Sequence, residues 1–487
     1  MRPYRILPAL LLAAAAAGCA DLELTNPNTR TTETFWRTQS DAVQGMNGVY
    51  NGLQLRGTYQ RWLPFAYDIR SDIGQSPSPG PELNQFNKFT LGSYDFEVNL
   101  ELYGHHYQAI FRANQAIANI PGVQMDAGLR DQLVGEAKFL RGLLYFNLAN
   151  LYGSVPLILQ PSSAGDRPAS ASNAELWTQI EKDFTEARAV LPVAPRMPGS
   201  ATRGAATAML GKAHLQQREW AQASQMFAEV VSSNRYTLLA SYADLFRGDN
   251  DNSAEAIFEV QFGGPSVTSA GTGGFHIGQM IGPCGPSYCD ARPTQWYFEE
   301  FQKEKTVGGQ ADPRLDATIF YNKAGGMDVF GIPFAQRYGN DLNALFWKKY
   351  TEYYLGRSDW NADINYKVVR LGGLLLNHAE ALNEQNRPAD ALPFVNRVRQ
   401  RAGLAPLAAG MSQAAMRAEI EHQETLELGL EGERWLYLRR HNLLGTPAVA
   451  AHDPTEFRFF VPGKSELLPI PTEETARNPN VTQNPGY

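Results

Sequence analysis

The clearest candidates for acid–base chemistry are Glu427 and Glu431, two carboxylates one helical turn apart in an arginine-rich segment. A pair of carboxylates can carry out glycoside hydrolysis, one as the acid and the other as the base or nucleophile. Arginines follow closely, however, and oppositely charged side chains on one helix pair readily. We therefore expect these carboxylates to pair with Arg434, Arg439 or Arg440 rather than to catalyse a reaction.

Other motifs for catalysis, cofactors and metals are missing or incomplete. The sequence contains no H-E-x-x-H and no G-x-S-x-G. Gly463-Lys-Ser465 resembles the end of a phosphate-binding loop, but Arg458 occupies the position of its first glycine. The run from Asp249 to Ser253 lacks the turn glycine of a calcium loop. We expect no catalytic residues, no cofactor and no metal site.

Binding chemistry is better supported, because many aromatic residues lie in segments without helical periodicity. These residues are Trp62, Tyr67, Tyr94, Phe96, Trp296, Tyr297, Tyr338, Trp347, Tyr353, Tyr354 and Trp360. A pyranose ring can place its C–H face on an aromatic ring while its hydroxyls bond to Asp, Asn or Arg. The alternative is that most of these rings form the core of the inserted regions. The pattern therefore favours a sugar-binding surface and leaves the individual contacts open.

Two cysteines lie close together in a segment rich in glycine and proline. Cys284 and Cys289 are separated by four residues. An exported chain folds in an oxidising compartment, where such a pair readily forms a disulfide. A cysteine-based metal site is the alternative, but His276 is the only imidazole nearby. We predict a Cys284–Cys289 disulfide that stiffens a loop.

The N-terminal segment has the pattern of a bacterial lipoprotein signal. Two arginines precede an apolar run over Ile6–Ala17, which is shorter than the ~20 residues of a membrane span. We predict a signal peptide over residues 1–18, acylation of Cys19, and a lipid anchor and tether over 19–32. The alternative is a soluble secreted protein with an incidental cysteine.

The composition is that of a folded protein with a large core. The chain has 487 residues, of which 43% are hydrophobic and 19% charged, and these values exclude global disorder. Lys and Arg number 43 against 50 Asp and Glu, so the net charge is −7. Because no block of basic residues is present, we expect no nucleic-acid partner.

Several long stretches carry apolar residues at helical spacing. The spacing predicts helices over residues 38–54, 100–120, 131–152, 172–190, 202–217, 219–233, 366–386, 388–402 and 412–441. Residues 256–262 alternate in part like a short strand. The intervals 55–98, 234–365 and 445–487 are rich in Gly, Pro, Asn, Asp and aromatic residues, so we expect irregular structure there.

Two predicted helix pairs have the spacing of a tetratricopeptide repeat, in which small residues let two helices approach closely. The first pair places Leu210, Gly211, His214, Ala223 and Phe227 at the offsets of that repeat. The second pair places Leu375, Leu382, Ala391 and Val395 at the same offsets. We therefore predict a mainly α fold, a tetratricopeptide-like helical repeat scaffold with long irregular loop insertions and a few short strands.

A set of short motifs is distributed over most of the chain. They are Phe35-Trp36 with Asn47-Gly48-Val-Tyr50, Glu136-Ala-Lys-Phe-Leu-Arg141 with Tyr152-Gly-Ser-Val-Pro-Leu157, Ala379-Glu-Ala-Leu-Asn383 with Val395-Asn-Arg-Val-Arg399, Glu431-Gly-Glu-Arg-Trp435, and Leu468-Pro-Ile-Pro471 with Gln483-Asn-Pro-Gly-Tyr487. In these motifs the sequence resembles the SusD/RagB family of nutrient-uptake outer-membrane lipoproteins. The motifs are specific as a set, although each alone is not.

The resemblance implies a single SusD-like domain over residues 33–487. Its helical scaffold would comprise residues 33–233 and 366–444, with a loop-rich insertion at 234–365 and a C-terminal tail at 445–487. The resemblance also implies a SusC-like TonB-dependent transporter barrel as partner, over which the protein acts as a lid. The protein would then be lipid-anchored in the outer membrane and face the cell surface.

The family builds its ligand site from the segment after the first helix and from the long central insertion. On this sequence the resemblance points to Tyr67, Asp68, Arg70, Asp72, Phe96, Asn99, Trp296 and Tyr297 as ligand-binding residues.

Together these features predict a non-catalytic surface lipoprotein that captures oligosaccharide or another nutrient and delivers it to the transporter. Release requires modest affinity, micromolar or weaker, which is about −8 kcal/mol. Two alternatives stay open: a surface glycoside hydrolase with two carboxylates in the aromatic loops, and a peptide-binding adaptor that uses the helical repeats. A reducing-end assay would identify a glycoside hydrolase. Ligand binding that does not need Trp62 or Trp296 would identify a peptide-binding adaptor.

Overall fold

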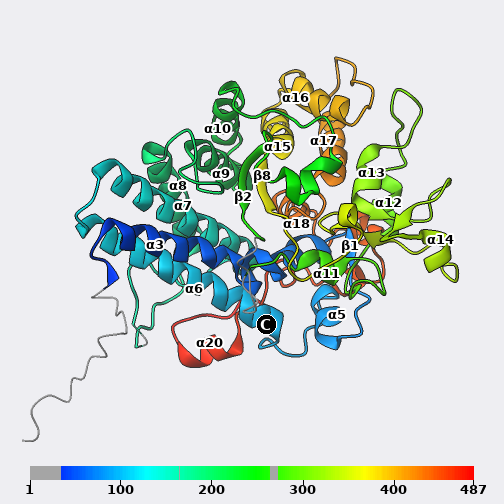
Figure 1. Cartoon of the computed structure of the whole chain (residues 1–487). Coiled ribbons are helices and arrows are strands. Elements are labelled where there is room, and N and C mark those ends of the chain that lie inside the picture. The colour runs from blue at the N-terminus through cyan, green and yellow to red at the C-terminus, as the bar shows by residue number, and fades with distance from the viewer. Residues whose placement is uncertain (1–34, 164, 264–272) are drawn as a thin grey trace, which may run out of the picture.

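The computed structural model describes residues 35–163, 165–263 and 273–487. The predicted signal peptide, Cys19 and the tether therefore lie outside the described residues. The described chain is mainly helical, which confirms the predicted fold class (Figure 1). The long helices are α3 (Gln39–Asn51), α6 (Glu97–Asn119), α7 (Ala127–Tyr152), α8 (Asn173–Val190), α9 (Arg203–Gln216), α10 (Trp220–Ser232), α15 (Leu371–Glu384), α16 (Pro388–Arg401) and α17 (Gln413–Leu428).

Helix α7, with 26 residues, shows how the local sequence fixes an element. Asp126 caps its N-terminus by accepting a hydrogen bond from the backbone N–H of Leu129 at 2.8 Å. Gly153 ends the helix with a φ of 70°, a conformation that favours glycine. The apolar stripe from Leu133 to Leu151 is buried, so the helical period of the sequence marks the face that packs.

The predicted repeat contacts between helices are confirmed. Successive helices from α6 to α10 pack against each other, and α15 packs against both α10 and α16. A Cβ built on Gly211 of α9 would come within 2.6 Å of the Phe227 ring of α10, so only glycine allows this approach. In the second pair, Leu375, Ala391 and Val395 are fully buried at the corresponding positions.

Between α10 and α15 the chain leaves the helical scaffold and forms short elements. The described strands are β1 (Gly74–Gln75) with β3 (Arg292–Pro293), β2 (Ala256–Val260) with β8 (Tyr366–Arg370), β4 (Ile319–Phe320) with β7 (Phe346–Trp347), and β5 (Asp328–Val329) with β6 (Ile332–Pro333), all antiparallel. Pairing of β1 with β3 attaches this insertion to the segment that follows α3.

Short helices complete the fold. They are α4 (Trp62–Pro64), α5 (Pro81–Asn87), α11 (Ile277–Ile281), α12 (Gln295–Glu300), α13 (Pro313–Thr318), α14 (Phe334–Arg337), α18 (Arg434–Arg440), α19 (Pro447–His452) and α20 (Thr472–Arg477). Two π-helical turns, η3 (Arg56–Gln60) and η4 (Phe65–Ile69), lie on either side of α4. Single 3₁₀ turns are η2 (Gly52–Gln54), η5 (Ile120–Gly122), η6 (Ala243–Phe246), η7 (Gly248–Asn250), η8 (Tyr353–Leu355) and η9 (Phe457–Phe459).

Two of the predicted helix boundaries are wrong. Residues 366–370 form strand β8, because they pair with β2 and are buried along their whole length. Helix α15 therefore begins at Leu371. The predicted helix 412–441 is divided into α17 and α18, because Leu430 and Gly432 between them adopt left-handed φ angles of 65° and 79°.

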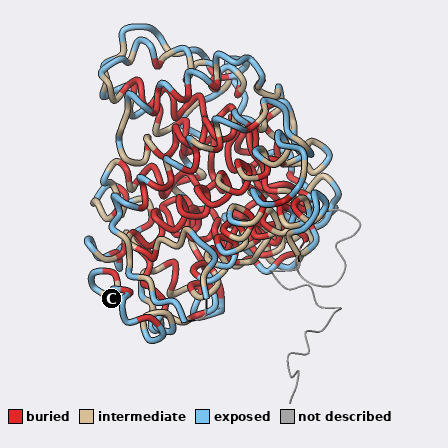
Figure 2. Tube along the Cα trace, turned by 90° about the vertical axis from the view of Figure 1, so that its left-hand side faces the viewer, coloured by how far each residue is buried: buried red, intermediate tan, exposed pale blue. Residues whose placement is uncertain are grey.

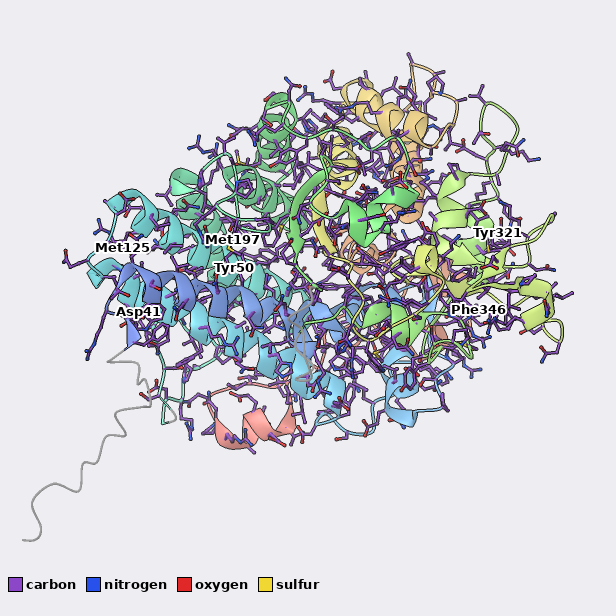
Figure 3. The ribbon with its side chains drawn as sticks, in the orientation of Figure 1. Asp41, Tyr50, Met125, Met197, Tyr321 and Phe346 are labelled. Carbon is purple, nitrogen blue, oxygen red and sulfur yellow. A yellow bond between two sulfur atoms is a disulfide. The ribbon has the colours of Figure 1, made fainter. Side chains whose placement is uncertain are left out.

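The apolar side chains gather in one large core and one small one. The large core extends from Ala42 of α3 to Val481 in the tail (Figure 2). The small core, around Val329 and Phe346, belongs to the insertion, and Figure 3 places Phe346 far across the molecule from Asp41. None of the helices in the described ranges has the length and apolar character of a membrane span.

Tyr50 explains part of one motif, because it connects α3 to the scaffold. Its hydroxyl donates to Glu136 Oε2 on α7 at 3.1 Å and accepts the backbone N–H of Ala201 at 2.9 Å. Burial and Glu136 raise the pKa of Tyr50 well above its ordinary value, so the hydroxyl keeps its proton. Figure 3 shows Tyr50 near Met197, and both residues line the same pocket beside α3.

A buried ion network closes the scaffold around the insertion, and it corrects the predicted pairing of Glu427 and Glu431. The Arg370 guanidinium at the end of β8 bonds Glu431 through Nε at 2.7 Å and Glu427 through Nη1 at 2.5 Å. Nη1 also bonds Glu255, the residue before β2, at 2.8 Å. These four side chains are at most 3% exposed. The paired carboxylates therefore face Arg370 rather than the arginines of α18.

Further cations complete this network from the insertion and from α16. Lys349 bonds Glu431 at 2.6 Å, Arg314 contacts Glu427 at 3.4 Å, and Arg401 also pairs with Glu427. Burial alone would raise the pKa of Glu427, but the surrounding arginines hold it far below its ordinary value. Burial lowers the pKa of Lys349 to about 8. The carboxylates thus stay ionised as ion-pair partners and are not available as proton donors near neutral pH.

We expect Arg370→Gln to lower the free energy of unfolding by about 3–5 kcal/mol, because it leaves buried carboxylates without their partner. Guanidinium unfolding followed by circular dichroism measures this change. The matched control is Arg387→Gln, which removes an exposed ion pair with Asp390 and should cost less than ~1 kcal/mol. Equal losses in the two variants would contradict a special role for the buried network.

Candidate functional site

The structure buries seven of the eight residues that were predicted for the ligand site. These residues, all at most 4% exposed, are Tyr67, Asp68, Arg70, Asp72, Phe96, Asn99 and Tyr297. Their polar groups make contacts inside the protein, and a ligand contact of these residues stays a prediction.

Long-range bonds of these residues hold the segment after α3 against the C-terminal part of the chain. Arg70 lies 4.6 Å from the Trp435 ring centroid and donates to the Ser465 carbonyl at 2.8 Å. Asp72 pairs with Arg434 at 2.6 Å and with His452 at 2.8 Å. Burial would raise the pKa of Asp72, but these two partners hold it below its ordinary value.

Other members of the predicted set bond in the same way. Asn99 donates to the Tyr94 carbonyl at 2.7 Å and to the Pro469 carbonyl at 3.0 Å, and its side-chain oxygen accepts from the Tyr152 hydroxyl at 3.0 Å. Asp68 accepts the backbone N–H of Gly432 at 2.7 Å. Asn99 therefore fixes the start of α6 against the tail, and Asp68 fixes the turn between α17 and α18.

Trp296, the eighth predicted residue, keeps partial exposure at the start of α12. One face of its ring is stacked on His452, with centroids 3.7 Å apart and planes within 6°. Arg434 lies 5.3 Å from the ring centroid. Because His452 already occupies one face of the indole, a ligand contact of Trp296 stays a prediction.

A surface cluster of aromatic and basic side chains lies elsewhere, and we call it the Trp360 platform. It consists of Arg61, His276, Tyr288 and Trp360. The Arg61 guanidinium carbon lies 5.0 Å from the Trp360 ring centroid, and His276 meets the same ring edge-on at 5.0 Å. Tyr288, which is 59% exposed, packs on Trp360 with ring centroids 5.3 Å apart. The platform thus presents an exposed phenol and a half-buried indole beside a guanidinium.

Backbone hydrogen bonds bring the three segments of the platform together. The His276 N–H donates to the Gln60 carbonyl at 3.2 Å, which joins the start of α11 to the residue before Arg61. The Phe275 N–H donates to the Ala362 carbonyl at 3.1 Å, which joins α11 to the Trp360 segment. A Cβ at Gly274 would come within 2.4 Å of the Trp360 carbonyl, so this crossing requires glycine.

The predicted disulfide is confirmed, and it constrains the loop that carries Tyr288. Cys284 and Cys289 are bonded, with their Cα atoms 4.8 Å apart. The Tyr288 N–H donates to the Gln279 carbonyl of α11 at 2.9 Å. The loop is therefore held both by a covalent bond and by α11, which limits the freedom of the most exposed ring of the platform.

Arg61 and His276 form a hydrogen bond whose direction is fixed by chemistry. Arginine can only donate, so the His276 Nδ1 atom, 3.0 Å from Arg61 Nη2, must be the unprotonated ring nitrogen. Burial, together with the positive charges of Arg61 and Arg56, lowers the pKa of His276 to about 4. His276 is therefore neutral near pH 7, with its proton on Nε2, and it orients Arg61 without adding charge.

Carboxylates at the edge of the platform are engaged by neighbouring side chains. Glu101 of α6 accepts from the Trp62 indole N–H at 2.7 Å and pairs with Arg56. Asp290, next to the disulfide, accepts from the Ser78 hydroxyl at 2.8 Å. Burial raises the pKa of both carboxyl groups above their ordinary values. The edge is thus polar on both sides of Arg61, as a ligand rich in hydroxyl groups requires.

The platform uses the two segments that the family resemblance indicates, the segment after the first helix and the central insertion. Trp62 and Trp360 were among the aromatic candidates of the sequence, but Arg61, His276 and Tyr288 were missed. The cysteine pair that brackets Tyr288 was the available signal, because a disulfide in an exposed loop fixes the residues between its ends. Nothing in the local sequence distinguishes Arg61 from other arginines.

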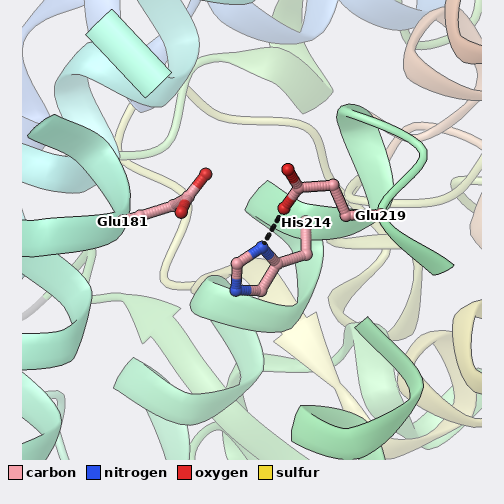
Figure 4. A group of neighbouring side chains, drawn as sticks. All are labelled: Glu181, His214 and Glu219. Atoms are coloured by element: carbon pink, nitrogen blue, oxygen red, sulfur yellow. Dashed lines mark hydrogen bonds and ion pairs between the residues drawn. The ribbon is translucent and has the colours of Figure 1, made fainter. Parts of the chain in front are cut away.

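One group in the described residues has the geometry of three metal ligands, although the sequence analysis assigned none. Oxygen and nitrogen atoms of Glu181, His214 and Glu219 lie within 4.8 Å of one another (Figure 4). His214 Nδ1 is 2.6 Å from Glu219 Oε2, and Gln217 donates to Glu181 at 2.6 Å. These hydrogen bonds account for the cluster as a link between α8 and the α9–α10 turn, and we assign no metal to it.

The fold and the platform define a helical-repeat protein whose loop-rich insertion carries exposed aromatic side chains. The family model described as "SusD family" matches residues 254–487, and the model described as "Starch-binding associating with outer membrane" matches residues 67–215. The chain belongs to the SusD family.

Relatives and solved structures agree with this assignment over nearly the whole chain. "SusD-like protein P2" of Formosa agariphila is 25% identical, with both chains covered completely. A SusD superfamily protein from Bacteroides vulgatus superposes with a TM-score of 0.84 at 25% identity, over 93% of this chain and 100% of the other. A structure described as a laminarin-binding SusD-like protein gives 0.76 at 27% identity, over the same shares of each chain.

We expect the folded protein to resist protonation of His276 down to a pH near 4. The unfolded chain binds that proton near pH 6.5, so the free energy of unfolding falls as the pH is lowered from about 6.5 towards 4. Histidine ¹H–¹⁵N spectra should show the Nε2–H tautomer at pH 7. In Arg61→Gln the pKa of His276 should rise, because a repelling charge is lost, whereas Arg387→Gln should leave it unchanged. If the pKa of His276 stays unchanged in Arg61→Gln as well, the electrostatic coupling between Arg61 and His276 is contradicted.

Proposed function

We propose that this protein is a non-catalytic, cell-surface glycan-binding lipoprotein that captures oligosaccharide and delivers it to a partner TonB-dependent outer-membrane transporter. The Trp360 platform is the observation that carries the proposal. Tyr288 and Trp360 offer ring faces for the C–H side of a pyranose, and the second terminal nitrogen of Arg61 makes no hydrogen bond within the described ranges. A sugar hydroxyl can accept from that nitrogen.

The geometry also favours reversible capture. The platform is an open surface rather than an enclosed cavity, since Tyr288 keeps 59% of its surface exposed. Binding to such a surface relies on few ring contacts, so we expect affinities in the micromolar range or weaker, about −8 kcal/mol. A carrier that hands its ligand to a transporter needs this modest affinity, because a slow release would limit uptake.

The fate of the paired carboxylates supports a binding role over hydrolysis. Glu427 and Glu431, the best candidates for acid–base chemistry, lie inside the protein in ion pairs with Arg370. Glu101 and Asp290, two carboxylates beside the platform, are each engaged by a neighbouring side chain, and Asp359, next to Trp360, accepts the backbone N–H of Asn361 at 2.9 Å. A glycoside hydrolase needs two carboxyl groups on either side of the scissile bond, so the engagement of these carboxylates favours binding over hydrolysis.

The comparisons support both the ligand class and the cellular location. A matching family model is described as starch-binding and associated with the outer membrane, and a similar structure is described as binding laminarin. Both ligands are polysaccharides, so we extend glycan binding to this chain. The lipid anchor at Cys19 and the transporter partner are proposed from the N-terminal pattern and from the family resemblance.

We expect Trp360→Ala and Tyr288→Ala each to weaken glycan binding about tenfold or more, which is about 1.4 kcal/mol, because each removes a stacking face. A glycan array with the mature chain identifies the ligand, and titration calorimetry then measures the affinity. Trp296→Ala is the comparison variant and should lose less affinity than Trp360→Ala, since His452 already occupies one face of the Trp296 ring. Loss of binding in Trp296→Ala alone would assign the site to Trp296 instead, and release of reducing ends from the ligand would contradict a non-catalytic role.

The anchor and the partner require a separate experiment. Cells grown with labelled palmitate should label the protein, and Cys19→Ala should abolish the label and release the protein from the membrane fraction. A gentle detergent extract should yield the protein together with a barrel-sized membrane protein. If the unmodified protein takes up no label, the anchor is wrong, and if it purifies alone, the transporter partnership is wrong.

A further inference from the structure

A second concave site lies on the face of α6 that points away from the platform. It is a pocket of about 310 Å³ whose lining includes Tyr103, Gly104 and Tyr107 of α6, Glu474 and Arg477 of α20, and the oppositely charged pair Asp166 and Arg167 from the segment after α7. In Figure 1, α20 runs close to α6. Successive helical residues are about 100° apart, so Tyr103 lies nearly opposite to Glu101, which borders the platform. The two sites therefore share one helix but not one surface.

Two tyrosines form the floor of this pocket. The rings of Tyr103 and Tyr107 are 4.9 Å apart, and Tyr103 also meets Tyr152 edge-on at 5.3 Å. Tyr107 uses its hydroxyl to donate to the Pro156 carbonyl at 2.7 Å. The Tyr103 hydroxyl makes no well-aligned hydrogen bond among the described residues and interacts only with the neighbouring Tyr107 hydroxyl, although the side chain is only 5% exposed. A buried polar group without a well-aligned partner is uncommon, and a ligand hydroxyl would satisfy it.

Gly104 is the second observation that points to a ligand. It lies in the interior of α6, where glycine is a poor helix former. A Cβ built on Gly104 would meet no described atom within 4 Å, so the packing of the helix does not need glycine at this position. What glycine does provide is open space on the wall of the pocket, as close approach of a ligand to a helix backbone requires.

The charged groups at the opening are nearly balanced. Arg477 pairs with Glu473 at 2.8 Å on the exposed side of α20. Glu474 makes no side-chain hydrogen bond or ion pair in the described ranges, and burial raises its pKa above the ordinary value. The pocket thus combines aromatic surface, a hydroxyl without a well-aligned partner and a half-buried carboxylate. These groups suit a ring with several hydroxyl groups and no net charge.

We propose that this pocket binds a single neutral pyranose unit, at a site separate from the Trp360 platform. Ligand pockets in proteins measure about 300–1,000 Å³, and this pocket is at the lower end of that range, which fits one sugar ring and not a chain. The Tyr103 hydroxyl and Glu474 would bond the sugar hydroxyls, and the tyrosine rings and Gly104 would meet its C–H face. The inference rests on the proposed function for its ligand class only.

Saturation-transfer NMR on the full chain in detergent tests the proposal, with the methyl glycosides of glucose, galactose, mannose and xylose as probes. We expect at least one probe to bind, and Gly104→Leu to weaken that binding about fivefold or more by filling the pocket. Tyr103→Phe removes only the hydroxyl and should also weaken it, with an unchanged melting curve as evidence of intact folding. The matched control is Gly48→Leu on α3, where an added Cβ likewise meets no described atom within 4 Å.

The platform variant separates this inference from the proposed function. Trp360→Ala should weaken oligosaccharide binding about tenfold or more and leave the Gly104-sensitive signal intact. If every probe signal disappears in Trp360→Ala, or if Gly104→Leu changes none of them, the pocket is not a sugar site. An absence of signal for all the probes in the unmodified protein has the same meaning, whatever the platform binds.

Discussion

The structure depends above all on the Arg370 network, because this network joins segments that no local interaction could bring together. Arg370 ends β8, Glu255 precedes β2, Glu427 lies at the C-terminal end of α17, and Glu431 lies in the turn that follows α17. Burying these charges is costly unless every partner is in place, so the ion pairs form only when the scaffold has closed around the insertion. A partly closed scaffold would bury some of these charges without their partners, and such arrangements are therefore disfavoured. The network thus couples the folding of the segments before and after the insertion.

The same network sets the position of the binding surface. Lys349 and Arg314 belong to the insertion, and both pair with the carboxylates that Arg370 holds. The insertion is therefore attached to the scaffold by these ion pairs and by the β1–β3 pair, and the disulfide stiffens the loop that carries Tyr288 within the insertion. The rings of Tyr288 and Trp360 lie on loops, yet they are fixed before a ligand arrives. Such preorganisation reduces the conformational entropy that the side chains lose on binding. An open surface that makes few contacts needs this reduction to bind a ligand at all.

The sequence predicted those parts of the fold that follow from periodic patterns. The local spacing of residues predicted helix α7 and the close approach of Gly211 to Phe227, and the structure contains both. Residues 366–370 were predicted as helix and form a strand. A short apolar run is compatible with either element, and only its pairing with the distant β2 decides between them. The burial of Asp72 was missed for a related reason. Its partner Arg434 is 362 positions away, so a charged residue that looked available for a ligand is buried in an ion pair.

These findings separate the reactive side chains of the protein from its binding surface. Its strongest acid–base candidates lie in buried ion pairs. Arginines keep Glu427 ionised, and Arg434 keeps Asp72 ionised. The platform retains ring faces and one guanidinium oriented by a neutral histidine. Such a surface is suited to recognise a sugar by shape and hydrogen bonding, as the proposed function requires. The buried carboxylates close the scaffold, and a carboxylate held in such an ion pair cannot at the same time serve a ligand.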